Sequence, residues 1–190
     1  MTKIAVLVGS LRKESINRKL AGALEKLAAG RMQFVYADLT NLPHYNEDLW
    51  DKVPDSVTQL KATLEGADAV LIVTPEYSRT YPGVIKDAID WATRPWGKNS
   101  WAGKPLAITG TSPGAIGTAI AQQHLRTTMV AVGTAVMGQP ELYYAYKPDH
   151  FGPDGDVTDE ATKAYLEGWI DSFANWIAKT GERELARLSA

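Results

Sequence analysis

Apolar residues in this chain occur in two alternating patterns. Short continuous runs have the length of buried strands, at residues 4–8, 32–37, 67–74, 105–111 and 134–137. Between these runs, apolar positions recur every three or four residues, the spacing of one helix face, at residues 16–27, 55–65, 82–92, 116–125 and 166–177. Ser15 is the predicted N-cap of the first helix, and Thr158 that of the last.

A chain that alternates strands and helices in this way is expected to form a parallel sheet covered by helices on both faces. No repeat, linker or low-complexity segment interrupts the alternation, so residues 1–190 are expected to form a single α/β domain. Residues 142–147 either extend the sheet or form an arm.

For a sheet with strand order 2-1-3-4-5, the ligand site lies in the crevice between strands one and three, at their carboxyl ends. The loops at residues 9–17 and 75–82 leave these two strands, and the loop at 111–115 follows strand four on the same edge. Three segments that are far apart in the chain are therefore expected to form one site.

Composition narrows the classes of function. The net charge is -2 and no basic run is present, which argues against nucleic acid as a partner. No apolar stretch approaches the ~20 residues of a membrane span. The chain has no cysteine, which excludes disulfides, thiol catalysis and thiolate metal sites and fits a cytoplasmic protein.

The first loop has the residues of a phosphate site. It lacks the glycines of a dinucleotide fingerprint and the Gly-Lys-Ser/Thr of a P-loop, and instead carries Ser10, Arg12, Ser15 and Asn17. Several such donors can surround one terminal phosphate, like that of FMN. Four cations crowd the positive end of the first helix dipole, at positions 12, 13, 18 and 19. This arrangement predicts a bound anion; the alternative is a solvated turn with a serine cap.

The second loop, at residues 75–81, suits a flat ring. Its backbone amides could bind the polar edge of such a ring, and Tyr77 or Tyr81 could stack on it or flank it. The alternative is a turn whose tyrosine packs locally.

These segments resemble the NAD(P)H-dependent FMN reductase family, which includes quinone, azo-dye and chromate reductases. The resemblance covers roughly residues 3–140. Its motifs are Gly9-Ser10-Leu11-Arg12-x-x-Ser15-x-Asn17-Arg18, then Pro75-Glu76-Tyr77 with Pro82-Gly83-Val84-Ile85-Lys86-x-Ala88-Ile89-Asp90-Trp91, then Gly103-Lys104-Pro105 and Gly117-Thr118 with Gln122-x-His124-Leu125-Arg126. It implies a flavodoxin-like fold, with a five-stranded parallel sheet in the order 2-1-3-4-5, and bound FMN.

The resemblance also implies which residues hold FMN. It implies that the first loop binds the phosphate group, through Ser10, Leu11, Arg12, Ser15, Ile16 and Asn17. The residues that it places along the flavin ring are Pro75, Glu76, Tyr77, Ser78, Ser112 and Gly114. The family commonly has asparagine at positions 78 and 87, where this chain has Ser78 and Asp87, so the contact at 78 is expected through the backbone.

The implied reaction transfers hydride from NADPH or NADH through flavin N5 to a small acceptor: a quinone, free flavin, an azo compound or chromate. It needs no side chain as acid or base, so no catalytic residue is assigned, and the three histidines lack metal-binding spacing. Arg79 is either a contact for an anionic substrate or a solvated arginine. The family forms homodimers or homotetramers, and segments 42–50 and 91–101 are the predicted contacts.

Two other classes of function remain open. Gly110-Thr111-Ser112-Pro113-Gly114 matches the Gly-x-Ser-x-Gly motif of serine hydrolases, with His124 or the pair Asp149-His150 as partners. Proline after the serine lacks the N–H that an oxyanion hole needs, which argues against this function. The second alternative is a flavodoxin-like electron carrier without turnover.

Overall fold

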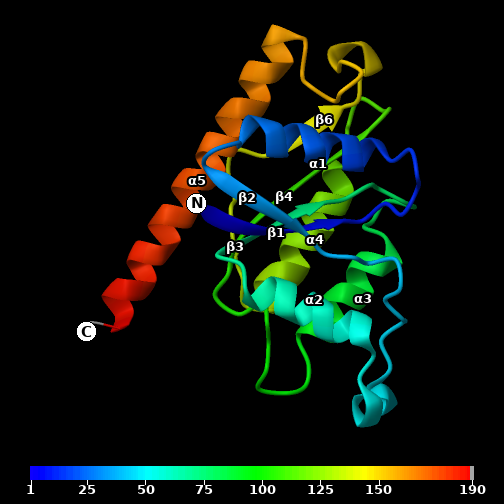
Figure 1. Ribbon diagram of the computed structural model, residues 1–190, viewed down its shortest axis with the longest axis vertical. Coiled ribbons are helices and arrows are strands. Elements are labelled where there is room, and N and C mark those ends of the chain that lie inside the picture. The colour runs from blue at the N-terminus through cyan, green and yellow to red at the C-terminus, as the bar shows by residue number, and fades with distance from the viewer. Residues whose placement is uncertain (189–190) are drawn as a thin grey trace.

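The computed structural model describes residues 1–188, with side chains described through residue 181 (Figure 1). A parallel sheet of six strands forms its centre, in the order β2-β1-β3-β4-β5 with β6 also paired to β4. The strands are β1 (Thr2–Val8), β2 (Met32–Tyr36), β3 (Ala69–Val73), β4 (Pro105–Ser112), β5 (Ala135–Val136) and β6 (Leu142–Ala145). The expected fold class and strand order are confirmed.

The edge of the sheet beside β4 differs from the expectation of one fifth strand. β5 pairs with the start of β4, where Pro105 lies opposite Ala135, and β6 pairs with its end, where Thr109 lies opposite Leu142. The segment between them contains Pro140, which has no N–H to donate to a ladder. Two short strands therefore share this position, and the segment that begins at Leu142 extends the sheet.

The described chain contains five α-helices and two short 3-10 helices, most of them between strands. They are α1 (Ile16–Leu27), α2 (Asp55–Glu65), α3 (Gly83–Ala92), α4 (Ala119–Ala131) and α5 (Glu160–Leu188), with η1 (Glu47–Lys52) and η2 (Pro148–His150). Helices α1 and α5 lie on one face of the sheet and α2, α3 and α4 on the other (Figure 1). In β1, Ile4 and Val6 face the first layer, whereas Ala5 and Leu7 face the second. Burial on both faces is why β1 and β3 contain continuous apolar runs, at residues 4–8 and 69–73.

The N-terminal ends of the helices agree with the predicted caps in one case and differ in two. Ser15 caps α1, as predicted, because its Oγ accepts a hydrogen bond from the Arg18 N–H at 3.2 Å. Asp159, and not Thr158, caps α5: its Oδ1 accepts from the Thr162 N–H at 2.8 Å. Ile116 was expected on the buried stripe of α4 but precedes that helix and is 57% exposed.

Candidate functional site

The carboxyl ends of β1, β3 and β4 meet at one edge of the sheet, as expected for a ligand site. The Gly9 N–H donates to the Val73 carbonyl at 2.9 Å, and the Thr74 N–H donates to the Thr109 carbonyl at 2.8 Å. Gly110 permits this close approach, since a Cβ there would lie 1.9 Å from the Thr74 carbonyl oxygen. The three predicted loops are therefore neighbours.

The first loop places free donors at the start of α1. The first N–H groups of a helix have no partner within the helix, and Ser15 satisfies only that of Arg18. Arg12 is exposed and forms no ion pair or hydrogen bond within the described chain. Unpaired N–H groups beside an unpaired guanidinium suit a phosphate, because helix dipole and charge act together.

The other residues predicted for the phosphate differ in how they are placed. Ser10 and Ile16 are half-buried, Leu11 is exposed and Ser15 is buried. The Asn17 amide bonds to β4: its Nδ2 donates to the Thr111 carbonyl at 3.0 Å, and its Oδ1 accepts from the Thr111 N–H at 2.9 Å. Asn17 is only 2% exposed, so it joins α1 to β4 and leaves its backbone N–H for a ligand.

The second loop is a tight two-residue hairpin. Tyr77 and Thr80 exchange backbone hydrogen bonds of 2.9 and 3.0 Å across it. The central residues Ser78 and Arg79 have φ of 50° and 65°, a left-handed conformation that favours glycine and asparagine. Tyr77 is 48% exposed at the tip, whereas Pro75 is buried at the base. Strain of this kind concentrates at functional sites.

Glu76 has a structural task that the sequence does not reveal. Its Oε2 accepts hydrogen bonds from the Ile120 and Ala121 N–H groups, both at 3.1 Å, at the start of α4. Thr118, the residue just before α4, does not cap this helix with its own side chain. Glu76 was predicted to lie along the flavin ring; its carboxylate is bonded to the start of α4, which leaves its backbone for a ligand.

Helix α4 holds the hairpin at two further points. Thr80 Oγ1 lies 3.2 Å from His124 Nδ1, and the Tyr81 hydroxyl lies 3.1 Å from Thr128 Oγ1. With Glu76, these contacts attach the hairpin along α4 and leave Tyr77, Ser78 and Arg79 exposed. No local sequence pattern links these pairs, since each joins residues more than forty positions apart.

The third loop does not have the arrangement of a serine hydrolase. The Ser112 hydroxyl donates to the Gly117 carbonyl at 2.6 Å and accepts from the Gly114 N–H at 3.2 Å. His124 faces Thr80, and His150 Nδ1 lies 2.6 Å from Thr162 Oγ1. Neither histidine contacts Ser112, so the base of a serine nucleophile is not in place.

Ser112 and Gly114 do lie on the same edge as the first two loops, at the end of β4. Gly114 is exposed, and Ser112 is half-buried. Their internal hydrogen bonds hold the turn in one shape and leave its outer surface to border a ligand.

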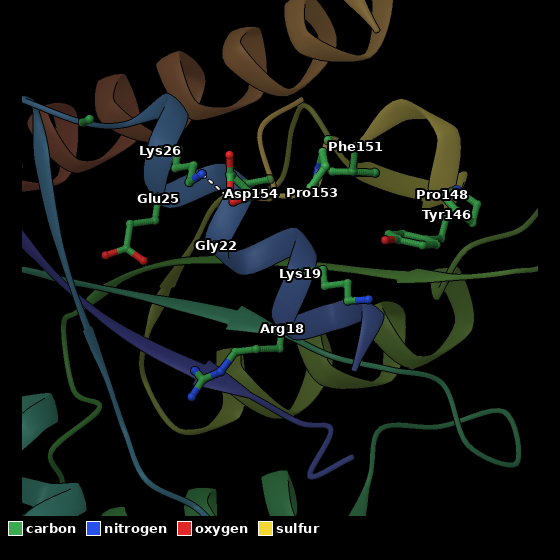
Figure 2. A pocket seen from close by; sticks show the side chains of 14 residues that line it. Arg18, Lys19, Gly22, Glu25, Lys26, Tyr146, Pro148, Phe151, Pro153 and Asp154 are labelled. Carbon is green, nitrogen blue, oxygen red and sulfur yellow. Dashed lines mark hydrogen bonds between the residues drawn. The ribbon is translucent and has the colours of Figure 1, made fainter. Parts of the chain in front are cut away.

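A cavity of about 840 Å³ lies apart from these loops, between α1 and residues 146–155 (Figure 2). The rings of Tyr146 and Phe151 stack there with centroids 5.2 Å apart, and the Lys26 amine donates to the Asp154 carbonyl at 2.6 Å. None of the twelve residues predicted to bind FMN lines this cavity.

The described residues also limit the class of site. No helix among them is both long and apolar enough to cross a membrane. Within the same part of the chain, no group of three or more His, Cys, Asp or Glu side chains is placed to hold a metal ion.

Comparisons with known proteins agree with this geometry. Residues 2–149 match the family described as NADPH-dependent FMN reductase. A 2-hydroxy-1,4-benzoquinone reductase from a Burkholderia species is 46% identical over 175 residues, which cover 92% of this chain and 96% of the relative. A quinone reductase of Pseudomonas putida is 41% identical, with 92% and 94% covered.

A solved structure has the same fold throughout. It is FerB, a flavoenzyme NAD(P)H:(acceptor) oxidoreductase from Paracoccus denitrificans, 53% identical with a TM-score of 0.93. The similarity covers 95% of this chain and 99% of FerB. It establishes the flavodoxin-like fold that the motifs implied.

Proposed function

Because the chain belongs to the NADPH-dependent FMN reductase family, we propose that it is an FMN-dependent NAD(P)H oxidoreductase that reduces quinones. One observation supports this proposal most strongly. At one edge of the sheet, the unpaired Arg12 and the free N–H groups at the start of α1 lie beside the strained, exposed hairpin that follows β3. The first part suits a phosphate and the second a flat ring, which are the two ends of FMN.

The residues present fit FMN, with two of the predicted side chains in supporting positions. The first loop would bind the phosphate through Arg12, the Ser10 and Ser15 hydroxyls, and the backbone of Leu11, Ile16 and Asn17. The backbone of residues 75–78 and the loop at Ser112 and Gly114 would contact the ring. The side chains of Asn17 and Glu76 support these loops, since the Asn17 amide is bonded to β4 and Glu76 Oε2 is bonded to α4.

Bound FMN supplies hydride and electron transfer, and the protein positions it. Arg12 balances the phosphate charge. Glu76, His124 and Thr128 hold the hairpin on α4, so that Tyr77 stands at the site in a fixed position. Neither Ser112 nor a histidine is arranged to transfer a proton, and none is needed.

The names of the relatives suggest the acceptor. Two of them, at 46% and 41% identity, are quinone reductases. We therefore place quinones first among the substrates, before free flavin, azo compounds and chromate, with NADPH or NADH as the donor.

Oligomer formation is part of the same proposal. Within segment 91–101, Trp91 and Trp101 are fully buried, whereas Trp96 is 88% exposed. Within segment 42–50, the rings of Tyr45 and Trp50 pack against Trp91 at 4.9 and 5.3 Å. We propose a homodimer or homotetramer of single-domain subunits in which Trp96 supplies the apolar contact.

A visible spectrum and a coupled assay test the function. The purified protein is expected to be yellow, or to turn yellow with FMN, and to oxidise NADPH repeatedly with a benzoquinone. A protein that neither binds FMN nor oxidises NADPH would contradict the proposal. Reduction of bound FMN without repeated turnover would indicate an electron carrier. Ester hydrolysis lost in Ser112→Ala would indicate a hydrolase.

A further inference from the structure

The cavity between α1 and residues 146–155, which we call the α1 cavity, has no part in the proposed function (Figure 2). Its volume of about 840 Å³ lies within the range of about 300–1,000 Å³ that is typical of small-molecule sites. Its lining combines small residues of α1, aromatic rings of the opposite segment and charged side chains. This combination indicates a ligand with an apolar body and a charged group.

A glycine in the middle of α1 gives the cavity its depth. Gly22 lies in the interior of the helix, where every residue except proline is more favourable than glycine. No atom of another element lies within 4 Å of the position that a Cβ would take there, and the backbone of Gly22 is not left-handed. Neither packing nor backbone conformation therefore requires glycine at this position. With Ala23 and Ala29, it forms a low floor that leaves room for a flat ring beside the helix.

The opposite wall of the cavity is aromatic and is held in place. The rings of Tyr146 and Phe151 stack with an interplanar angle of 14° and are half-buried. Lys26 attaches this segment to α1, since its amine donates to the Asp154 carbonyl at 2.6 Å and to Asp156 Oδ1 at 2.7 Å. A ring that enters the cavity therefore meets a preformed aromatic surface.

The charges of the lining differ between the two ends of the cavity. At one end, Lys26 is balanced by Asp156. Two helical turns away, about 10 Å along α1, Lys19 points to the side on which Tyr146 lies (Figure 2). Its partner Glu14, 3.3 Å away, lies outside the lining, and both side chains are more than half exposed. An ion pair this exposed stabilises little, so an anion in the cavity can take its place.

The other charged residues of the lining are engaged or distant. The Arg18 guanidinium carbon lies 4.4 Å from the centre of the Tyr36 ring, and Glu25 Oε2 accepts from the Tyr36 hydroxyl at 2.8 Å. Arg18 and Lys19 leave α1 in opposite directions (Figure 2). Asp154 is exposed in the turn at the other end. Lys19 is therefore the cation that a ligand in the cavity can use.

We propose that the α1 cavity binds a flat aromatic carboxylate. Its ring would lie between Gly22 and the stacked rings of Tyr146 and Phe151, and its carboxylate would pair with Lys19. The low floor and the aromatic wall suit the ring, and the lysine at one end suits the single negative charge. This binding site shares no residue with the predicted FMN site and does not depend on the proposed function.

Calorimetric titration with 2-naphthoate tests the site, with and without added FMN. We expect saturable binding that FMN does not change, and an affinity about two- to fivefold higher than for the neutral 2-naphthamide, the effect of an exposed ion pair. In Lys19→Ala this difference should disappear. Glu14→Gln, which frees Lys19 from its partner, should change the affinity for 2-naphthoate in the opposite direction and raise it.

Filling the cavity is the second part of the test. Gly22→Leu places its side chain in open space, so the protein should fold, and 2-naphthoate should bind more than about tenfold more weakly. Gly168→Leu is the matched control. Gly168 is an exposed glycine of α5, it also has open space at its Cβ position, and it does not line the cavity. Circular dichroism checks the fold of both variants; if Gly22→Leu does not fold, Lys19→Ala decides.

Several outcomes would overturn the proposed site. Unchanged binding in Gly22→Leu would do so, as would an equal loss in Gly168→Leu. Equal affinity for 2-naphthoate and 2-naphthamide would exclude the pairing with Lys19. No saturable binding, or displacement of 2-naphthoate by FMN, would also contradict it. Failure of the proposed function is recognised separately, as a protein that oxidises neither NADPH nor NADH, and it leaves the 2-naphthoate results unchanged.

Discussion

Glu76 caps a helix that begins more than forty residues away, with its Oε2 3.1 Å from the Ala121 backbone nitrogen. This bond joins the hairpin after β3 to the start of α4. It adds to the contacts that Thr80 and Tyr81 make with α4 and holds a turn whose central residues, Ser78 and Arg79, are strained. The position of Tyr77 at the site therefore depends on a carboxylate that need not touch the ligand.

Replacing Glu76 with alanine should destabilise the fold. Two N–H groups of α4 lose their acceptor, for which we expect a loss of about 1–3 kcal/mol in the free energy of unfolding. Urea denaturation of the FMN-free protein measures it. Glu76→Gln is the control, since its amide oxygen can still accept, and should lose less. Equal losses in both variants would contradict the capping role.

Asn17→Ala should also lower the free energy of unfolding, because Asn17 links α1 to β4. The Thr111 N–H and carbonyl are buried and each loses its partner, so we expect a loss of about 2–4 kcal/mol. Asn175 is exposed on α5, and Asn175→Ala should change stability by less than about 0.5 kcal/mol. If Asn17→Ala weakened FMN binding but left unfolding unchanged, Asn17 would be a ligand and not a structural link.

Arg12→Ala, in contrast, should weaken FMN binding and leave the stability of the fold unchanged. Arg12 has no partner within the described chain, so its loss should leave unfolding nearly unchanged. FMN affinity should fall by about 10- to 100-fold, the loss of charge-assisted contacts to phosphate. Fluorescence titration of FMN measures this, with Arg12→Lys expected in between. Unchanged FMN affinity would exclude Arg12 from the phosphate site.

Ser78→Asn should stabilise the protein. The φ of 50° at Ser78 is costly for most side chains, and asparagine adopts this conformation more readily. We expect a gain of about 0.5–1 kcal/mol, measured by thermal unfolding. Ser78→Ala, which offers no such local hydrogen bonding, should give no gain. A loss of stability in Ser78→Asn would mean that the turn is not strained.

The cap of α5 should make stability depend on pH in acid. Hydrogen bonds from the side chain and backbone of Thr162 lower the pKa of Asp159. A carboxyl whose pKa is lower in the folded state stabilises it fully above the unfolded pKa, about 3.9, and loses this effect as pH falls through the folded value. Asp159→Ala should therefore lower the melting temperature at pH 6–7, and by progressively less as pH falls below about 3.9 through the folded pKa of Asp159. A constant difference across this range would exclude an ionised cap.

The local pattern of apolar and polar residues was sufficient to predict most of the fold. The buried strands are apolar at each position because both faces are covered, so the runs at 4–8 and 69–73 are visible without knowledge of the partners. The Ser15 cap was equally visible, since donor and acceptor lie three residues apart. The division of the last sheet position between β5 and β6 was not predicted, because pairing with β4 is decided between strands.

The sequence by itself determined the alternation of strands and helices, the three loops of the site, and the motifs that resemble an FMN reductase, because these depend on neighbouring residues. Only the tertiary structure decided what individual side chains do there. Asn17 and Glu76 stand within the motifs, yet their polar atoms bind Thr111 and the start of α4. A polar group takes the partner that folding places within hydrogen-bond reach, and spacing along the chain does not specify contacts between distant segments.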